Sequence, residues 1–182
     1  MSKLKCVAIG GEPATGKTTL MKTFLEMVKP EDRLKFGLVR GHLSRTLNLA
    51  VLGLYGDGKT FEGTDMLSMA VNPHFVKYIE KNNRNIAFEG DRLFTVSNLE
   101  KLDKKYDLRL IILQQDEKEL EKRHKKRNDT QTEKFLKGRK TKISNILSAF
   151  QGKTELFKLN EINDTFNLAE ELLEWLKPDT RR

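Results

Sequence analysis

Residues 11–18 read Gly-Glu-Pro-Ala-Thr-Gly-Lys-Thr, and they directly follow the apolar run Cys-Val-Ala-Ile at positions 6–9. The octapeptide fits the pattern G-x-x-x-x-G-K-[ST], in which a glycine-rich turn joins a buried strand to a helix and surrounds phosphate groups with backbone N–H donors. Residues 19–25 suit the helix whose N-terminus faces the anion. We therefore predict a phosphate-binding loop. The complete strand–loop–helix context disfavours the alternative, a glycine-rich turn without a ligand.

The loop also assigns roles to individual residues. A lysine at the position of Lys17 reaches the β- and γ-phosphates, and a hydroxyl at the position of Thr18 binds Mg²⁺. We therefore predict that Lys17 is catalytic and that Thr18 is a metal ligand. The loop residues expected to contact the nucleotide are Gly11, Ala14, Thr15, Gly16, Lys17, Thr18 and Thr19.

Length and composition predict one domain spanning residues 1–182. With 182 residues, of which 37% are hydrophobic, the chain can bury one good core but not two comfortable ones. No stretch reaches the roughly 18 apolar residues of a membrane span, and the first strand begins too early to leave room for a cleaved signal. We expect a cytoplasmic protein with no membrane partner. The single cysteine, Cys6, excludes a disulfide framework.

The net charge of +8 is concentrated in one part of the chain. Residues 118–142 are rich in lysine and arginine, and three interpretations remain open for them. The three interpretations are a solvated helix face, a binding site for nucleotide phosphates, and a binding site for the backbone of a nucleic acid. Because a mononucleotide needs only a few cations, the surplus favours a polymer.

The order of elements predicts an α/β fold of the P-loop NTPase type. Apolar strands are expected at 6–9, 33–40, 85–90, 108–113 and 155–159, and helical segments separate most of them. Such alternation indicates a parallel five-stranded sheet with helices on both faces. The extended residues 47–54 run into a Gly-Asp-Gly-Lys turn at 56–59, which predicts a small inserted β-hairpin at about 46–62.

Acidic residues are predicted at the edge of the sheet where such folds bind ligands. Residues 88–92, Phe-Glu-Gly-Asp-Arg, end a central strand. There Glu89 is a candidate metal ligand or substrate contact, Asp91 a proton acceptor and Arg92 an acceptor-binding residue. Asp65 is a second candidate for orienting the acceptor and taking its proton. The alternative for both aspartates is helix capping, and which of Asp65, Glu89 and Asp91 is the general base stays open.

Three arginines predict a lid at about 128–142. Arg123 and Arg127 lie four residues apart, hence on one helix face, and Arg139 is expected in a following loop. Closure of such a loop over the nucleotide would bring cations onto charge that develops during transfer. Arg123 is assigned to nucleotide binding, and Arg127 and Arg139 to catalysis. The alternative is a solvated basic helix with a flexible loop.

These motifs give the chain a family resemblance. The phosphate loop, the strand end at 88–92 and the arginine-rich helix after 108–113 resemble the nucleoside/nucleotide-kinase branch of P-loop proteins. Residues 61–71, 88–94 and 135–139 are similar to bacteriophage P-loop kinases of the 5-hydroxymethyluracil DNA kinase type. The resemblance implies an ATP- and Mg²⁺-dependent kinase that phosphorylates a hydroxymethyl pyrimidine within DNA. It also implies location in the host-cell cytoplasm if the protein is phage-encoded.

Two other functions remain as alternatives. One is a deoxynucleoside monophosphate kinase, and the other is a DNA-binding P-loop NTPase. The strand before Asp91 lacks the apolar-run-plus-Asp signature of motor ATPases, and the Asn-Lys-x-Asp motif of guanine-nucleotide switches is absent from the sequence. Both absences favour a kinase. The oligomeric state is not predicted.

Overall fold

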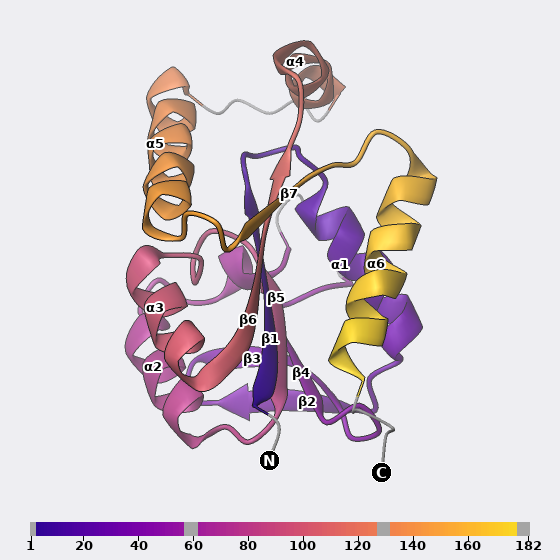
Figure 1. Cartoon of the computed structure of the whole chain (residues 1–182), viewed down its shortest axis with the longest axis vertical. Helices are drawn as coiled ribbons and strands as arrows, with labels where there is room; N and C mark the ends of the chain where they lie inside the picture. Colours follow the sequence, from indigo (N-terminus) through magenta and orange to yellow (C-terminus); the bar gives the residue numbers. More distant parts are fainter. Residues whose placement is uncertain (1–2, 57–61, 127–131, 178–182) are drawn as a thin grey trace.

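The computed structural model describes residues 3–56, 62–126 and 132–177, and it shows a central sheet with helices on both faces (Figure 1). The seven strands of the described residues lie in the order β2-β3-β4-β5-β1-β6-β7. Helices α1 and α6 cover one face, and α2, α3 and the lower part of α5 cover the other (Figure 1). The predicted α/β fold is confirmed.

Five neighbouring strands form the parallel part of the sheet. These are β4 (Leu49–Leu52), β5 (Asn85–Glu89), β1 (Leu4–Gly11), β6 (Tyr106–Gln114) and β7 (Thr154–Lys158). Each pairs in parallel with the next. The chain adds β4 and β5 on one side of β1 and then crosses to β6 on its other side, so the carboxyl end of β1 is the topological switch point where open α/β sheets bind ligands.

The prediction of five strands was too low by two, because an antiparallel pair extends the sheet. Strands β2 (Asp32–Phe36) and β3 (Val39–Ser44) replace the single strand expected at 33–40. Gly37 lies between them with a φ of 56°, a left-handed conformation that favours glycine and lets the chain reverse. Strand β3 then pairs antiparallel with β4 and attaches this hairpin to the parallel strands.

The segment expected as a hairpin at about 46–62 contributes β4 to the main sheet. Beyond β4, one antiparallel bridge joins Leu54 to Gly63, with N···O distances of 3.0 and 2.7 Å between their backbones. The intervening turn residues 57–61 lie outside the described residues. A single turn of 3₁₀ helix, η1 (Thr64–Met66), follows the bridge and leads toward α2.

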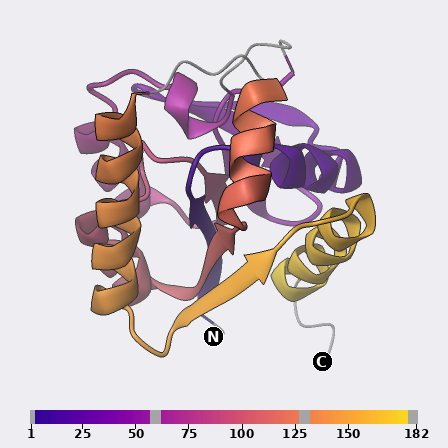
Figure 2. The same cartoon turned by 90° about the horizontal axis from the view of Figure 1, so that it is seen from above.

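The two faces of the sheet have separate cores. On one face, Leu20 and Phe24 of α1 (Lys17–Val28) pack with Leu168 and Leu172 of α6 (Ile162–Leu176). On the other, the core is formed by α2 (Asn72–Lys81), α3 (Val96–Lys105) and α5 (Glu133–Ala149). Both cores extend to the carboxyl edge of the sheet. Helix α4 (Glu117–Lys126) and the upper part of α5 rise above that edge (Figures 1 and 2).

Helix α5 begins earlier than the sequence predicted. Arg139 was expected in a loop, but it lies within α5, which starts at Glu133. The hydroxyl of Thr132 accepts a hydrogen bond from the backbone N–H of Phe135 at 3.3 Å and caps the helix. Residues 133–142 of the expected lid are therefore helical, whereas 128–131 and Arg127 lie outside the described residues. Among the helices described, none has the length and apolar character needed to cross a bilayer.

We expect Phe75 to be a major contributor to stability. Its ring is fully buried and meets Phe88 edge-to-face at 5.9 Å between centroids. Phe75→Ala should lower the free energy of unfolding by about 3–5 kcal/mol, because it removes buried area and leaves a cavity. Phe166, on α6, is 52% exposed, so Phe166→Ala should cost less than about 1 kcal/mol. Urea denaturation checks both, and equal losses would contradict this account of the core.

Candidate active site

The predicted phosphate loop between β1 and α1 contains two residues with positive φ that turn the chain sharply. Ala14 and Gly16 have φ values of 65° and 102°, which turn the backbone between the strand and the helix. The hydroxyl of Thr15 donates to the carbonyl of Glu12 at 2.8 Å and closes the loop. Helix α1 has glycine, Gly16, at its N-cap, so no side chain competes for its first N–H groups. This arrangement fits an anion with several oxygens.

Lys17 lies over its own loop. Its Nζ donates to the carbonyls of Gly11 at 2.9 Å and Glu12 at 2.7 Å. The amine is thus held at the mouth of the loop, where it can exchange a carbonyl for a phosphate oxygen. Thr19, also predicted to contact the nucleotide, is exposed in the first turn of α1.

Thr18 and Glu89 meet, although they are far apart in sequence. The hydroxyl of Thr18 donates to Oε1 of Glu89 at 3.3 Å. The parallel pairing of β1 with β5 places Glu89 opposite Ile9, two residues before the phosphate loop. The two residues predicted as metal ligands are therefore side by side.

Glu89 is a buried carboxyl, with only 1% of its surface exposed. Burial raises the pKa of Glu89 to about 7, and the negative charge of Asp65 acts in the same direction, while Lys17, Thr18 and the hydroxyl of Tyr55 favour the ionised form. Gly63 packs against it so closely that a Cβ there would lie 2.1 Å from Oε1. The carboxyl is thus fixed in position, and a bound cation would favour its ionised form.

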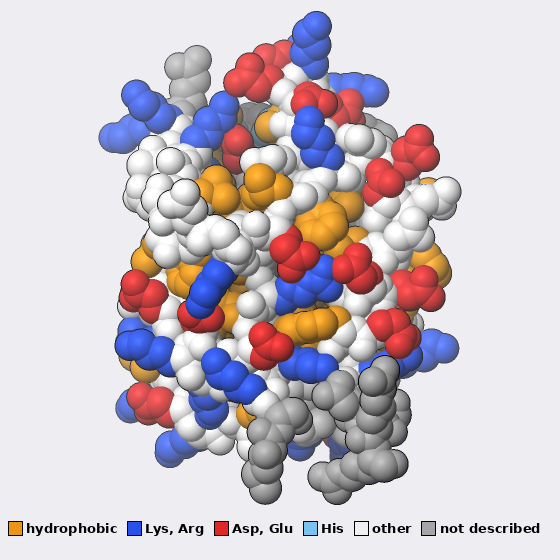
Figure 3. Space-filling view, viewed as in Figure 1, with side chains coloured by type: hydrophobic (Ala, Val, Ile, Leu, Met, Phe, Trp, Pro, Cys, Tyr) orange, Lys and Arg blue, Asp and Glu red, His pale blue; other side chains and the backbone are white. Residues whose placement is uncertain are grey.

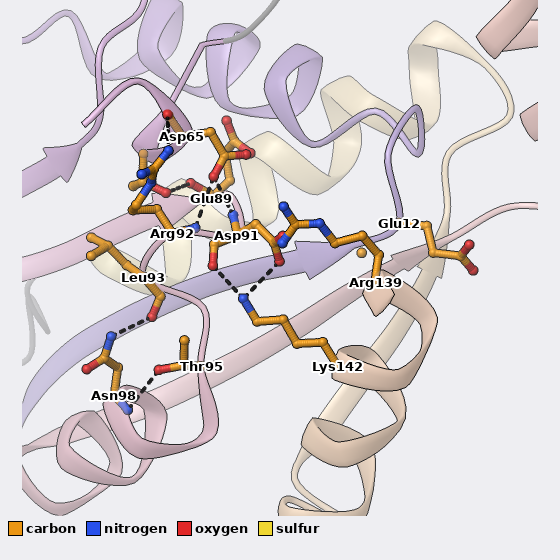
Figure 4. Close-up of polar contacts among 12 residues, drawn as sticks. Glu12, Asp65, Glu89, Asp91, Arg92, Leu93, Thr95, Asn98, Arg139 and Lys142 are labelled. Carbon is orange, nitrogen blue, oxygen red and sulfur yellow. Dashed lines mark hydrogen bonds and ion pairs between the residues drawn. The ribbon is translucent and has the colours of Figure 1, made fainter. Parts of the chain in front are cut away.

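Asp65 holds the turn that follows β5. Its Oδ1 accepts hydrogen bonds from the backbone N–H groups of Asp91 at 2.9 Å and Arg92 at 3.0 Å. The guanidinium of Arg92 donates to the backbone carbonyl of Asp65 at 2.9 Å and also contacts Met69. Asp65 therefore fixes the turn after β5 and does not cap a helix, which was the alternative predicted for it. Figure 4 shows these side chains gathered at the end of β5.

Two cations from α5 reach Asp91 (Figure 4). Arg139 forms an ion pair with its carboxylate, and Nζ of Lys142 lies 3.0 Å from Oδ1 and donates to the backbone carbonyl of Asp91 at 2.6 Å. Burial, followed by the neighbouring Arg139, lowers the pKa of Lys142 to about 8. Asp91 does not cap the next helix, because Thr95 accepts the N–H of Asn98 there at 3.3 Å.

Arg123 extends from α4 across the phosphate loop. Its guanidinium donates to the carbonyls of Ala14 at 3.4 Å and Leu159 at 3.1 Å, and it pairs with Glu119 at 2.8 Å. This position beside the loop agrees with a nucleotide contact. Arg127, the second arginine predicted on this helix face, lies outside the described residues.

The sequence reasoning missed two residues of this site. Lys142 was counted only as part of the basic segment, yet it contacts Asp91 twice. Its spacing of three from Arg139 was an available signal, since helical residues three apart share a face once α5 is known to begin at Glu133. Tyr55, which is buried beside Glu89, follows β4, and no local pattern marks it.

The residues present fit a magnesium nucleotide. Within the described ranges, no group of three or more His, Cys, Asp or Glu side chains is placed to hold a metal ion. Mg²⁺ in phosphoryl-transfer sites needs only one or two protein oxygens, because nucleotide phosphates and waters complete its shell. The hydroxyl of Thr18 and the carboxyl of Glu89 are such a pair.

Comparison with known proteins finds similarity among solved structures but none among family models or curated sequences. No protein-family model matches the sequence, and no curated protein sequence matches it. Among solved structures, the chain is similar to a shikimate kinase from Acinetobacter baumannii in complex with shikimate. The alignment covers 98% of this chain and 96% of that one, with 12% identity and a TM-score of 0.47. At this level the similarity supports no assignment of function, which therefore rests on the residues of the site.

Burial of Glu89 should make folding stability depend on pH. The pKa of about 7 in the folded protein exceeds the value of about 4.3 for an unfolded glutamate. Stability contributed by the protonated form is therefore complete at low pH and is lost as pH rises toward 7. Without Mg²⁺ or nucleotide, Glu89→Gln should lessen the loss between pH 5 and 8 by about 2–3 kcal/mol. Urea midpoints at both pH values check this, and an unchanged slope would contradict it.

Proposed function

We propose that the protein is an ATP- and Mg²⁺-dependent kinase that phosphorylates a hydroxyl group. The observation that carries the proposal is the contact between Thr18 and Glu89 at a preformed phosphate loop, with Lys17 at the loop mouth. The carboxylate of Asp91 and the cations Arg139 and Lys142 lie at the same carboxyl edge of the sheet. A phosphate loop beside an oxygen pair for Mg²⁺ and an acidic acceptor edge is the set of parts that phosphoryl transfer needs.

The chain's residues divide the work. Lys17 stabilises the negative charge of the transferring group, and Thr18 with Glu89 holds the metal ion. When bound, Mg²⁺ neutralises charge on the β- and γ-phosphates. Arg139 and Lys142 supply further positive charge from α5. Such preorganised charges act where charge develops and need little rearrangement during the reaction.

Asp91 is the proposed proton acceptor. Asp65 uses one oxygen to fix the turn, so we assign it a positioning role, whereas Asp91 reaches toward α5 at the open end of that turn. The acceptor hydroxyl gives its proton to Asp91 as its oxygen bonds to the γ-phosphorus. The bond between that phosphorus and the bridging oxygen breaks, and ADP leaves. Arg92 lies next to Asp91 and is proposed to contact the acceptor.

The proposed acceptor is a hydroxymethyl pyrimidine within DNA. Helices α4 and α5 together carry ten lysine and arginine residues against four glutamates. They rise above the carboxyl edge of the sheet, and Figure 3 shows lysine and arginine side chains, interspersed with acidic ones, over their upper parts. Lys118, Lys125, Lys134 and Lys137 are exposed and form no ion pair with any residue in the described part of the chain. This surplus, together with the sequence resemblance, supports a polyanionic substrate.

Radiolabelled ATP tests this function directly. The protein is incubated with γ-labelled ATP and Mg²⁺, and separately with hydroxymethyluracil-containing DNA, unmodified DNA or free deoxynucleotides. We expect label on the modified DNA alone. Label on free nucleotides would support a deoxynucleoside monophosphate kinase, and free phosphate stimulated by any DNA would support an NTPase. Either result would overturn the proposed acceptor.

Lys17→Ala provides the matched control for the same assay. It should reduce label transfer by about 100-fold or more, since a charge that acts on the transferring group is lost. Lys35→Ala, on exposed β2, removes the same charge away from the site and should leave transfer unchanged. Circular dichroism checks the fold of both. Near-normal transfer by folded Lys17→Ala would end the phosphate-loop assignment.

Salt dependence should report the role of the basic helices. If DNA phosphates bind them, the logarithm of affinity falls linearly with the logarithm of salt concentration, with a slope of about −0.9 per neutralised phosphate of a duplex. Replacing Lys125, Lys134 and Lys137 with Gln should weaken DNA binding and make the slope shallower by up to about 3, while KM for ATP stays nearly unchanged. Fluorescence anisotropy over a salt series measures this. A slope equal to the wild-type value would place the DNA elsewhere.

A further inference from the structure

A hollow of about 280 Å³ lies at the carboxyl ends of β6 and β7, beside the phosphate loop. Its lining includes Ile112 of β6 and Ile143 of α5, which packs against the core that contains Ile112. Asp116 and Lys158 also line it and pair with each other at 2.7 Å. Figure 3 shows this side of the molecule hollowed between α4 and α5.

The hollow borders the reaction centre. Glu12, the second residue of the phosphate loop, is one of its lining residues. Ile143 follows Lys142 directly and lies one helical turn after Arg139, so the same stretch of α5 that contacts Asp91 also forms the wall. A ligand in the hollow would therefore lie beside the phosphate loop and next to the stretch of α5 that carries these two cations.

The lining offers polar groups beside apolar ones. Gln114, the last residue of β6, is exposed, and its carboxamide forms no hydrogen bond with other residues in the described ranges. In Figure 4 the carboxylate of Glu12 points away from Asp91 and Arg139. A carboxamide both donates and accepts, whereas a carboxylate only accepts. The edge of a uracil-type ring, with carbonyl oxygens beside a ring N–H, complements this pair, and the ring itself suits contact with the isoleucines.

The volume also favours a single ring. Pockets for drug-sized ligands occupy about 300–1,000 Å³, so this hollow is at the small end. A base within a duplex must leave the stack before an enzyme can act on it, and such enzymes read the extruded base by hydrogen bonds to its edge and by apolar contacts to its faces. The basic helices α4 and α5 stand on either side, where they can bind the flanking phosphates.

We infer that the hollow between β6, β7 and α5 receives the pyrimidine base of the acceptor nucleotide, with Gln114 and Glu12 binding its edge and the adjoining Ile112 and Ile143 contacting its ring. The inference rests on the proposed kinase function, because it places the acceptor of that reaction. It makes Ile143 and Gln114 determinants of acceptor specificity that have no part in binding ATP.

Two variants and a matched control test the base pocket. Ile143→Trp fills the hollow, and Gln114→Leu removes the carboxamide while nearly keeping its size. Asn145→Trp adds the same indole to an exposed position of the same helix. For each, we would measure KM for hydroxymethyluracil-containing DNA and KM for ATP. Binding of the free nucleoside 5-hydroxymethyl-2′-deoxyuridine, in the presence of a non-hydrolysable ATP analogue, is followed by NMR.

Both pocket variants should raise KM for the DNA by about tenfold or more and weaken nucleoside binding equally, with KM for ATP within about twofold. Asn145→Trp should behave as wild type. If Ile143→Trp does not fold, Gln114→Leu carries the test alone. Unchanged nucleoside binding in the folded variants, or no binding to the wild type, would overturn the pocket.

The two proposals can fail separately. A wild-type protein that binds the nucleoside through Gln114 but phosphorylates nothing would refute the kinase and retain the pocket. A wild-type protein that phosphorylates DNA with a KM insensitive to Ile143→Trp and Gln114→Leu would retain the kinase and refute the pocket.

Discussion

The parallel pairing of β1 with β5 is the constraint on which the candidate site depends. It sets Ile9 opposite Glu89, so the strand that ends in the phosphate loop and the strand that ends in a carboxyl finish at the same level. This register alone brings the hydroxyl of Thr18 within hydrogen-bond distance of Glu89. Because β1 is buried between β5 and β6, a shift in register would displace a whole row of core side chains, and this cost keeps the two groups together.

The loop after β4 completes the surroundings of that pair. Tyr55 and Gly63 bring backbone and aromatic surface against Glu89, and Lys22 of α1 pairs with the buried Glu62 at 2.5 Å. A carboxyl enclosed in this way has little water to stabilise its charge, so its ionisation depends on nearby cations. The same enclosure that makes Glu89 costly to ionise alone makes it responsive to a metal ion.

The sequence predicted what local patterns can encode. The phosphate loop, the parallel strands and the acidic end of β5 each have a short-range signature, and their meeting follows from the rule that parallel strands share a carboxyl edge. The extra hairpin β2–β3 was missed because an apolar pattern does not reveal where Gly37 turns the chain. The helical state of Arg139 was missed because Gly138 and the surrounding lysines resemble a loop, whereas the cap at Thr132 and packing of the lower part of α5 decide otherwise.

Lys142 connects two parts of the molecule that are 51 residues apart in sequence, since it bonds both the backbone and the side chain of Asp91. The position of α5 and the state of the turn after β5 are consequently linked thermodynamically. A ligand that displaces Lys142 from Asp91 changes the free energy of holding α5 in its present position. By linkage, a movement of α5 changes the affinity of Asp91 for that ligand by the same amount. Helix α5 is therefore coupled to the site in both directions through the hydrogen bond and the ion pair that Lys142 forms with Asp91.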